Sequence, residues 1–210
     1  MTAGPEFTIR PYASEDLDSV YRVCLLTGDS GDDASELYDD PWALGHLYAG
    51  PYVTLEPELA FVLEDRDGLC GYVLGAADTR RFHRRMVESW LPPLQLALPE
   101  PHGDERQWSR TARIYYRLHH PELVYPEALE PYPSHLHIDL LPRCQGRGNG
   151  RRLMERLLEA LVELWSPGVH LGVGSANRRA HGFYEAMRFV ELFRQGDDGH
   201  QSIYLGRRLP

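Results

Sequence analysis

The sequence predicts an α/β fold, in which a mixed β-sheet of about six to seven strands carries helices on both faces. Two observations carry this prediction. Strand and helix patterns alternate from residue 135 to the end of the chain, and a β-hairpin pattern occupies residues 60–75. An apolar fraction of 42% is ordinary for a globular protein and argues against global disorder.

The first elements follow from local patterns. Residues 7–10 alternate like a short strand, and the polar residues 14–16 indicate a helix N-terminus. Apolar residues at helical spacing extend this helix to Gly28. The segments 60–64 and 70–75 flank a polar turn, which predicts a β-hairpin with a loop of about four residues.

Prolines interrupt any long helix between residues 80 and 133, among them Pro92, Pro93, Pro99 and Pro101. We expect short helices and loops that pack onto the main sheet. Residues 1–210 are therefore predicted to form a single domain with an insertion at residues 80–133. The segments after the insertion alternate between the two types, with strands at 135–141, 169–173, 189–192 and 202–205, and helices at 150–165 and 178–187.

Composition excludes several classes of protein. Acidic residues outnumber basic ones, 31 to 22, which disfavours nucleic-acid and membrane-surface binding. Cys24, Cys70 and Cys144 form no CxxC pair, and no His pair has i, i+4 spacing, so we expect neither a disulfide framework nor a metal site. The first residues lack a basic stretch and no long apolar run occurs, so we expect a cytoplasmic protein.

The segment Gln145-Gly146-Arg147-Gly148-Asn149-Gly150 lies between a strand and a helix. Glycines there let the backbone approach an anion, and the helix dipole adds about half a positive charge. The pattern is also compatible with a simple tight turn. It is neither a Walker A loop nor the G-x-G-x-x-G dinucleotide fingerprint.

These residues resemble the R/Q-x-x-G-x-G/A signature of the GNAT superfamily of N-acetyltransferases, and Leu140-x-Pro142 before them resembles its V-x-P. A second stretch, Asn177-x-x-Ala180-x-x-x-Tyr184 followed by Phe189, is similar to the superfamily's N-x-x-A-x-x-x-Y-x-x-x-G-F. Arg188 replaces the glycine of that pattern.

A narrower likeness covers residues 21–33, 50–52, 57–65 and 70–75. These segments resemble the acetyltransferase-like C-terminal domain of animal O-GlcNAc hydrolases, which is regarded as a pseudo-acetyltransferase because its cofactor loop has degenerated. The glycine loop of this chain keeps the superfamily pattern. The likeness therefore implies a branch that still binds the cofactor.

The resemblance implies a GNAT fold in which two splayed strands form an acetyl-CoA cleft. Strand residues near Asp139 would bond the pantetheine arm and the glycine loop would bind the pyrophosphate. The cofactor-binding residues that it implies are Ile138, Leu140, Gln145, Gly146, Arg147, Gly148, Asn149, Gly150, Arg151 and Asn177.

Catalysis by direct transfer needs a base for the amine and a proton for the leaving thiolate. The resemblance implies that Tyr184 supplies this proton, although the spacing alone also fits a core tyrosine. His135, His137 and Asp139 share one strand face, and His137 with Asp139 is the candidate base. Strand histidines that serve only structure are the alternative.

Asp29, Asp32 and Asp33 form an acidic turn, predicted either to clamp a cationic acceptor or simply to be a surface turn. We expect Cys24 to belong to the core and Cys144 to take no part in the chemistry. The predicted function is acetyl-CoA-dependent transfer to an amine of a small molecule or peptide. The alternative is a catalytically silent acetyl-CoA-binding or recognition module. Dimers are common in the superfamily, so a homodimer is also an expectation.

Overall fold

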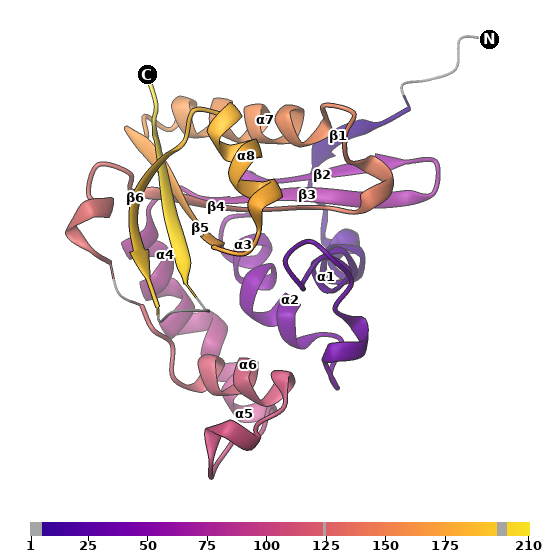
Figure 1. Ribbon diagram of the computed structural model, residues 1–210, viewed down its shortest axis with the longest axis vertical. Helices are drawn as coiled ribbons and strands as arrows, with labels where there is room; N and C mark the ends of the chain where they lie inside the picture. The colour runs from indigo at the N-terminus through magenta and orange to yellow at the C-terminus, as the bar shows by residue number, and fades with distance from the viewer. Residues whose placement is uncertain (1–5, 124, 197–200) are drawn as a thin grey trace.

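The computed structural model describes residues 6–123, 125–196 and 201–210. Within them the chain forms a 7-stranded sheet in the order β1-β2-β3-β4-β5-β7-β6 (Figure 1). The strands are β1 (Thr8–Pro11), β2 (Ala60–Asp65), β3 (Gly68–Ala76), β4 (Ser134–Leu140), β5 (Gly168–Gly174), β6 (Val190–Gln195) and β7 (Ser202–Arg208). The α-helices are α1 (Leu17–Leu25), α2 (Ala43–Tyr48), α3 (Gly50–Leu55), α4 (Thr79–Arg85), α5 (Leu91–Ala97), α6 (Arg110–His119), α7 (Asn149–Glu163) and α8 (Arg178–Ala186).

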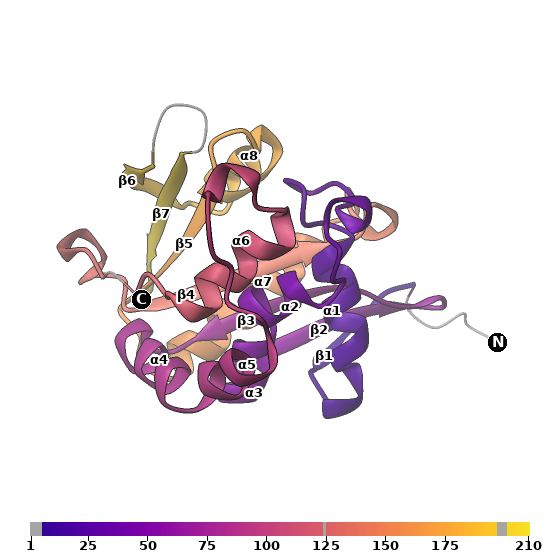
Figure 2. The same cartoon turned by 90° about the horizontal axis from the view of Figure 1, so that it is seen from below.

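Helices cover both faces of the sheet. Helix α7 packs on β2, β3 and β4, where its fully buried Leu153, Leu157 and Leu161 recur at helical spacing. Helices α1 to α6 lie on the opposite side, in front of the sheet when the molecule is viewed from below (Figure 2). The predicted mixed α/β fold is confirmed.

Strands β4 and β5 are parallel neighbours, yet they pair over a very short length. Their ladder contains Ser134 opposite Val169 and His135 opposite His170. Beyond His135, β4 continues to Leu140 along β3 alone, while β5 pairs with β7 over its whole length. The two strands therefore diverge, and the edge of β4 that faces β5 has no ladder partner among the described residues.

The insertion forms the short helices α4, α5 and α6, and a π-helical turn at Met86–Trp90 joins α4 to α5. Its two ends meet, because both the backbone N–H and the hydroxyl of Thr79 donate to the carbonyl of Pro133, at 2.8 and 2.7 Å. The fully buried carboxylate of Glu56 accepts from Ala77 N at 2.7 Å and from Arg81 at 3.1 Å. Glu56 thereby fixes the start of α4 to the core.

The hairpin differs from its predicted form. Asp65 pairs with Gly68, so the loop consists of Arg66 and Asp67 alone and the expected loop of about four residues was too long. Gly68 has a φ of 102°, which allows the chain to turn this tightly, and the Asp65 carboxylate accepts from Asp67 N at 2.9 Å.

Residues 1–5, on which the expectation of no leader rests in part, lie outside the described residues. In the part of the chain that the structure describes, none of the helices combines the length and the apolar character that a membrane span requires.

Candidate active site

The loop between β4 and α7 presents a row of backbone N–H groups. Gly146 and Gly148 have φ angles of 72° and 77°, in the left-handed region that favours glycine. A Cβ atom at either position would face open space. Within the described residues, the backbone N–H groups of residues 146–151 donate no hydrogen bond to the protein. With the positive end of the α7 dipole, these donors form a cradle suited to an anion.

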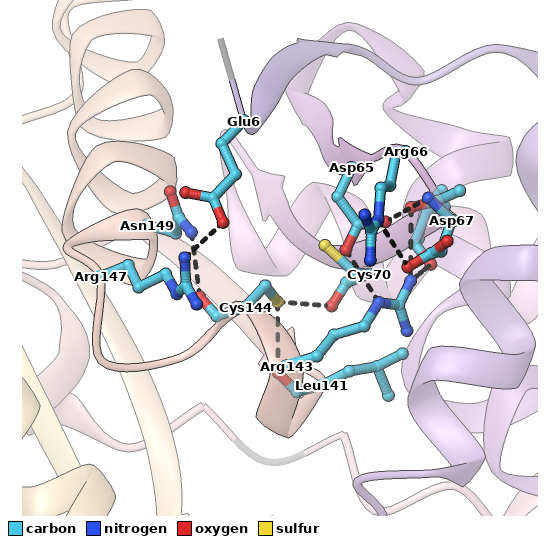
Figure 3. Close-up of polar contacts among 12 residues, drawn as sticks. Glu6, Asp65, Arg66, Asp67, Cys70, Leu141, Arg143, Cys144, Arg147 and Asn149 are labelled. Carbon is cyan, nitrogen blue, oxygen red and sulfur yellow. Dashed lines mark hydrogen bonds and ion pairs between the residues drawn. The ribbon is translucent and has the colours of Figure 1, made fainter.

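Side chains beneath the loop hold it in this shape. Gln145 Nε2 donates to the carbonyl of Leu140 at 2.5 Å, and Asn149 Nδ2 donates to the carbonyl of Cys144 at 3.0 Å. The thiol of Cys144 in turn donates to the carbonyl of Cys70 at 2.9 Å (Figure 3). The side chains of Gln145 and Asn149, both predicted to bind the cofactor, therefore stabilise the loop. The backbone N–H of Asn149 is still free to bind a ligand.

Two arginines link the loop region to neighbouring segments. Arg143 Nε lies 2.9 Å from Asp65 at the hairpin end of β2, and this hydrogen bond, with the positive charge of Arg143, lowers the pKa of Asp65 (Figure 3). Arg147 forms an ion pair with Glu6, and its guanidinium lies over the ring of Phe7, 5.6 Å from the centroid. Arg147 thus contacts the two residues that directly precede β1.

The polar face of β4 carries a compact network. Tyr72 on β3 lies opposite Asp139 in the ladder, and its hydroxyl donates to Asp139 Oδ2 at 2.6 Å. His137 Nε2 is 3.1 Å from both the same carboxylate oxygen and the Tyr72 hydroxyl. The Tyr48 ring stacks on the imidazole at a centroid distance of 5.9 Å. The structure therefore brings the predicted pair His137 and Asp139 into direct contact.

His137 carries a proton at neutral pH. Burial lowers its pKa, but the charge of Asp139, the hydrogen bond to it and the nearby Cys24 together outweigh burial and raise the pKa to about 10. The pair is thus an imidazolium and a carboxylate in contact. Such a pair gives up its proton only under alkaline conditions, or to a stronger base.

His135, two residues earlier on the same strand face, is in the opposite state. It is buried, its Nδ1 is 2.7 Å from the Thr79 hydroxyl, and the rings of Tyr52 and Phe82 flank it. Burial, followed by the nearby His170, holds its pKa well below the ordinary value, so it is neutral. The shared face predicted for the strand histidines is present, but only His137 faces a charge.

The stretch from Asn177 to Phe189, the second of the two family motifs, forms helix α8 and its two ends. The Asn177 Oδ1 accepts from Ala180 N at 3.0 Å and caps the helix N-terminus. At the other end, Phe189 N donates to the carbonyl of Tyr184 at 3.0 Å and Arg188 has a φ of 63°. This is a Schellman motif, in which the Tyr184 and Phe189 rings pack 5.8 Å apart. The motif therefore sets both ends of α8.

These helix ends place Tyr184 toward the β4 network. The residue is 8% exposed, and burial, then the charge of Asp139, raises the pKa of its phenol. The phenol is thus neutral and carries its proton. In the described part of the chain its hydroxyl makes no hydrogen bond, so it remains available to a ligand.

A cavity of 230 Å³ lies beside this network. Aliphatic and aromatic side chains together make up most of its wall, and two charged residues, Arg117 and Glu122, are also present. The lining includes Tyr48, Tyr52, Phe82, His135 and Tyr204. Because Tyr48 also stacks on His137, one ring separates the cavity from the His137–Asp139 pair.

The acidic turn lies apart from this lining. Asp29 Oδ1 is 3.2 Å from Arg110, and its backbone pairs with that of Asp32. Asp33 Oδ1 accepts from Ser35 N at 2.8 Å. These contacts give Asp29 and Asp33 structural partners. The role of the turn as an acceptor clamp stays a prediction.

Sequence reasoning missed two members of the site, Tyr72 and Tyr48. Neither belongs to a motif with a chemical role, and each reaches His137 from a different element. The ladder register of β3 against β4 was the one signal that would have identified Tyr72, since it lies directly opposite Asp139.

The model of the acetyltransferase (GNAT) family matches residues 29–189. The chain belongs to the GNAT acetyltransferase family. It is 30% identical over 213 residues to Protein O-GlcNAcase of Rattus norvegicus, in an alignment that covers 97% of this chain and 22% of that protein. The chain thus spans about a fifth of the length of the O-GlcNAcase relatives that it matches.

Solved structures with the same fold agree with this assignment. The chain is 44% identical to a protein named SsHAT, whose crystal structure superposes with a TM-score of 0.87 and covers 97% of this chain and 98% of that one. The structure of yncA from Salmonella typhimurium with its cofactor acetyl-CoA has a TM-score of 0.58 at 13% identity, over 98% of this chain and 95% of that one. At that identity the likeness supports the fold alone.

Proposed function

We propose that this GNAT chain is an acetyl-CoA-dependent N-acetyltransferase, which transfers acetyl directly to an amine of a small molecule or peptide. The observation that carries the proposal is the row of free N–H groups at residues 146–151, beside the point where β4 and β5 diverge. Donors at a helix N-terminus suit a pyrophosphate. A bare strand edge next to them suits an amide-containing arm such as pantetheine.

The cofactor contacts follow from the groups that the fold leaves unpaired. The backbone of Ile138 and the N–H group of Leu140 lie on the part of β4 that β5 has left, whereas the Leu140 carbonyl already accepts from Gln145. Asn177 uses its oxygen in the helix cap, which leaves its NH₂ group for the pantetheine arm. Gln145 and Asn149 hold the loop in shape, and residues 146–151 bind phosphate through their backbone.

Acetyl-CoA supplies the acetyl thioester, and this chain supplies the proton transfers. Tyr184 donates its proton to the leaving thiolate, a role that its neutral phenol permits. The His137–Asp139 pair takes a proton from the acceptor ammonium. The pKa of about 10 for His137 is close to that of an alkylammonium, so the proton transfer between them is close to thermoneutral. At neutral pH only a small fraction of His137 is unprotonated and able to act as the base.

The acceptor binds in the cavity beside the β4 network. Rings from Tyr48 and Tyr204 line it, and Glu122 contributes a carboxylate, a combination suited to an amine that carries apolar carbon. Residues of the insertion, Phe82 and Arg117 among them, complete the wall. The insertion therefore selects the acceptor, whereas the glycine loop and β4 serve the cofactor.

A silent binding module is the second candidate, and the protonated state of His137 favours it, because a base already bearing a proton does not activate an amine. Calorimetry with acetyl-CoA, followed by a thiol-release assay over alkylamines, arylalkylamines and lysine peptides from pH 7 to 10, separates the two. We expect binding and a release rate that grows with pH. Binding without release on any amine would support the module, and absence of binding would contradict both.

A further inference from the structure

Cys24 is a buried residue whose thiol lies next to the polar side chains of β4. It lies on the inner side of α1 and is 3% exposed, as expected for a core residue. Its thiol nevertheless faces β4, where the sulfur, a His137 nitrogen and an Asp139 oxygen all lie within 4.8 Å of one another. We refer to Cys24, His137 and Asp139 as the thiol cluster.

The thiol cluster has the donors of a transition-metal site. Thiolate, imidazole and carboxylate are the three ligand types that Zn²⁺ takes in proteins, and three protein ligands with one water are typical of an open site. Zinc bond lengths of roughly 2.0–2.3 Å in a tetrahedral arrangement put ligand atoms about 3.3–3.7 Å apart. The farthest ligand atoms therefore have to approach by at most roughly 1.1–1.5 Å. The His137 nitrogen and the Asp139 oxygen, 3.1 Å apart, are already slightly closer than this spacing.

Charge balance also suits a dication. A thiolate and a carboxylate neutralise Zn²⁺, so the loaded site has no net charge and avoids the cost of burying one. The Tyr72 hydroxyl donates to Asp139 Oδ2 and orients that carboxylate, as an outer partner of a metal ligand does. His137 and Asp139 are partly exposed, with side-chain fractions of 29% and 20%, so an ion has access.

The other two cysteines provide an internal contrast. Cys144 donates to the carbonyls of Cys70 and Leu141, and both cysteines are buried. Among the described residues, neither thiol joins a group of His, Asp or Glu that could hold an ion. A metal that requires a thiolate should therefore discriminate sharply between Cys24 and Cys144.

We propose that the thiol cluster binds a divalent transition-metal ion, with Zn²⁺ as the probe, and that the bound ion blocks acetyl transfer by occupying His137 and Asp139. The binding half of this inference is independent of the catalytic role. The inhibition half rests on the proposed function.

Titration of the metal-free protein with Co²⁺ tests the binding half. We expect saturation at one ion per chain, with thiolate-to-cobalt absorption in the near ultraviolet. Cys24→Ser should abolish that absorption, His137→Gln should weaken binding at least about tenfold, and Cys144→Ser should leave both unchanged. No thiolate absorption, or absorption that survives Cys24→Ser, would overturn the proposal. Circular dichroism and thermal melting confirm that each variant is folded.

Turnover measurements test the inhibition half once an acceptor is known. Zn²⁺ should suppress acetyl transfer in the unmodified protein and EDTA should restore it. The Cys24→Ser variant, compared with its own metal-free rate, should resist inhibition at least tenfold better. Stoichiometric Co²⁺ binding without turnover on any amine would contradict the proposed function and leave the metal site standing. Turnover that Zn²⁺ leaves unchanged would contradict the inhibition.

Discussion

The glycine loop and the polar face of β4 belong to one site, yet the chain encodes them in different ways. Residues 145–151 are consecutive, and their geometry follows from two glycines with positive φ and from anchors within a few residues. The network around His137 draws its members from α1, α2, β3 and β4. A local feature leaves a motif in the sequence, whereas an assembled one depends on the register of the sheet.

The largest effect should come from Gly148→Glu in the glycine loop, through the affinity for acetyl-CoA. A carboxylate at this position would enter the open space in front of the free N–H groups, and we expect acetyl-CoA affinity to fall by at least about a hundredfold. Calorimetry measures this. Gly103→Glu is the matched control, because Gly103 also has a positive φ, of 93°, and open space around its Cβ position. Equal binding by both variants would show that the loop does not bind the phosphates.

In the network around His137, Asp139→Asn should change the pKa of His137. The substitution removes the two largest influences that raise this pKa, while burial still lowers it, so the pKa should fall well below 10. NMR titration of the imidazole protons measures this fall. Glu100→Gln, beside the exposed His120, is the control and should leave His137 unchanged. A His137 pKa that stays near 10 would show that Asp139 does not hold the proton there.

Acid should destabilise the protein through histidines that lack such a carboxylate. Burial lowers the pKa of His170 to about 4 from 6.5, so between these pH values the unfolded chain takes up a proton that the native chain does not. The free energy of unfolding should fall by about 3 kcal/mol over this interval from His170 alone. Urea unfolding measures the fall. His170→Gln should reduce it, whereas the exposed His102→Gln should not.

The two roles of Asn177 can be separated. Asn177→Ala removes the helix cap and should cost about 1 kcal/mol in urea unfolding. Asn177→Asp keeps the capping oxygen and loses the NH₂ group, so stability should be retained while acetyl-CoA affinity falls. An unchanged affinity in the aspartate variant would restrict Asn177 to the helix end.

The smallest effect concerns Arg188, which occupies the C-terminal cap of α8 with a φ of 63°. Glycine adopts this conformation without a steric penalty, so Arg188→Gly should raise stability by about 0.5–1 kcal/mol. Thermal unfolding measures the gain, and Arg194→Gly, on strand β6, should give none. A loss of stability in Arg188→Gly would mean that the arginine side chain makes a contribution larger than the backbone strain.

The sequence allowed prediction wherever a signal is local. The order of strands and helices, the shared face of His135, His137 and Asp139, and the glycine loop all follow from periodicity or motif. The hairpin loop was predicted too long, because the pairing of Asp65 with Gly68 depends on a single positive φ. The charge state of each histidine was out of reach, since it depends on which partner the fold brings near.

Members of the β4 network from other elements could not be predicted for the same reason. Cys24 has the apolar helical spacing of a core residue, and it is one, yet its sulfur meets His137 across the packed interface of α1 and β4. Tyr72 is one of several apolar residues of a hairpin strand until the ladder sets it opposite Asp139. Sequence patterns report which side of an element is buried, and the tertiary contacts decide what it meets.

The hydrogen bonds from Thr79 to Pro133 join the two ends of the insertion, so the chain leaves the sheet and returns to it at one point. A segment closed in this way can change in length at a small entropic cost, about 0.6 kcal/mol for each doubling. Related chains could therefore exchange this segment, and with it the acceptor, while the sheet and the cofactor loop stay as they are. Among related chains, the cofactor loop and the sheet would then stay constant, while the insertion that lines the acceptor cavity would vary.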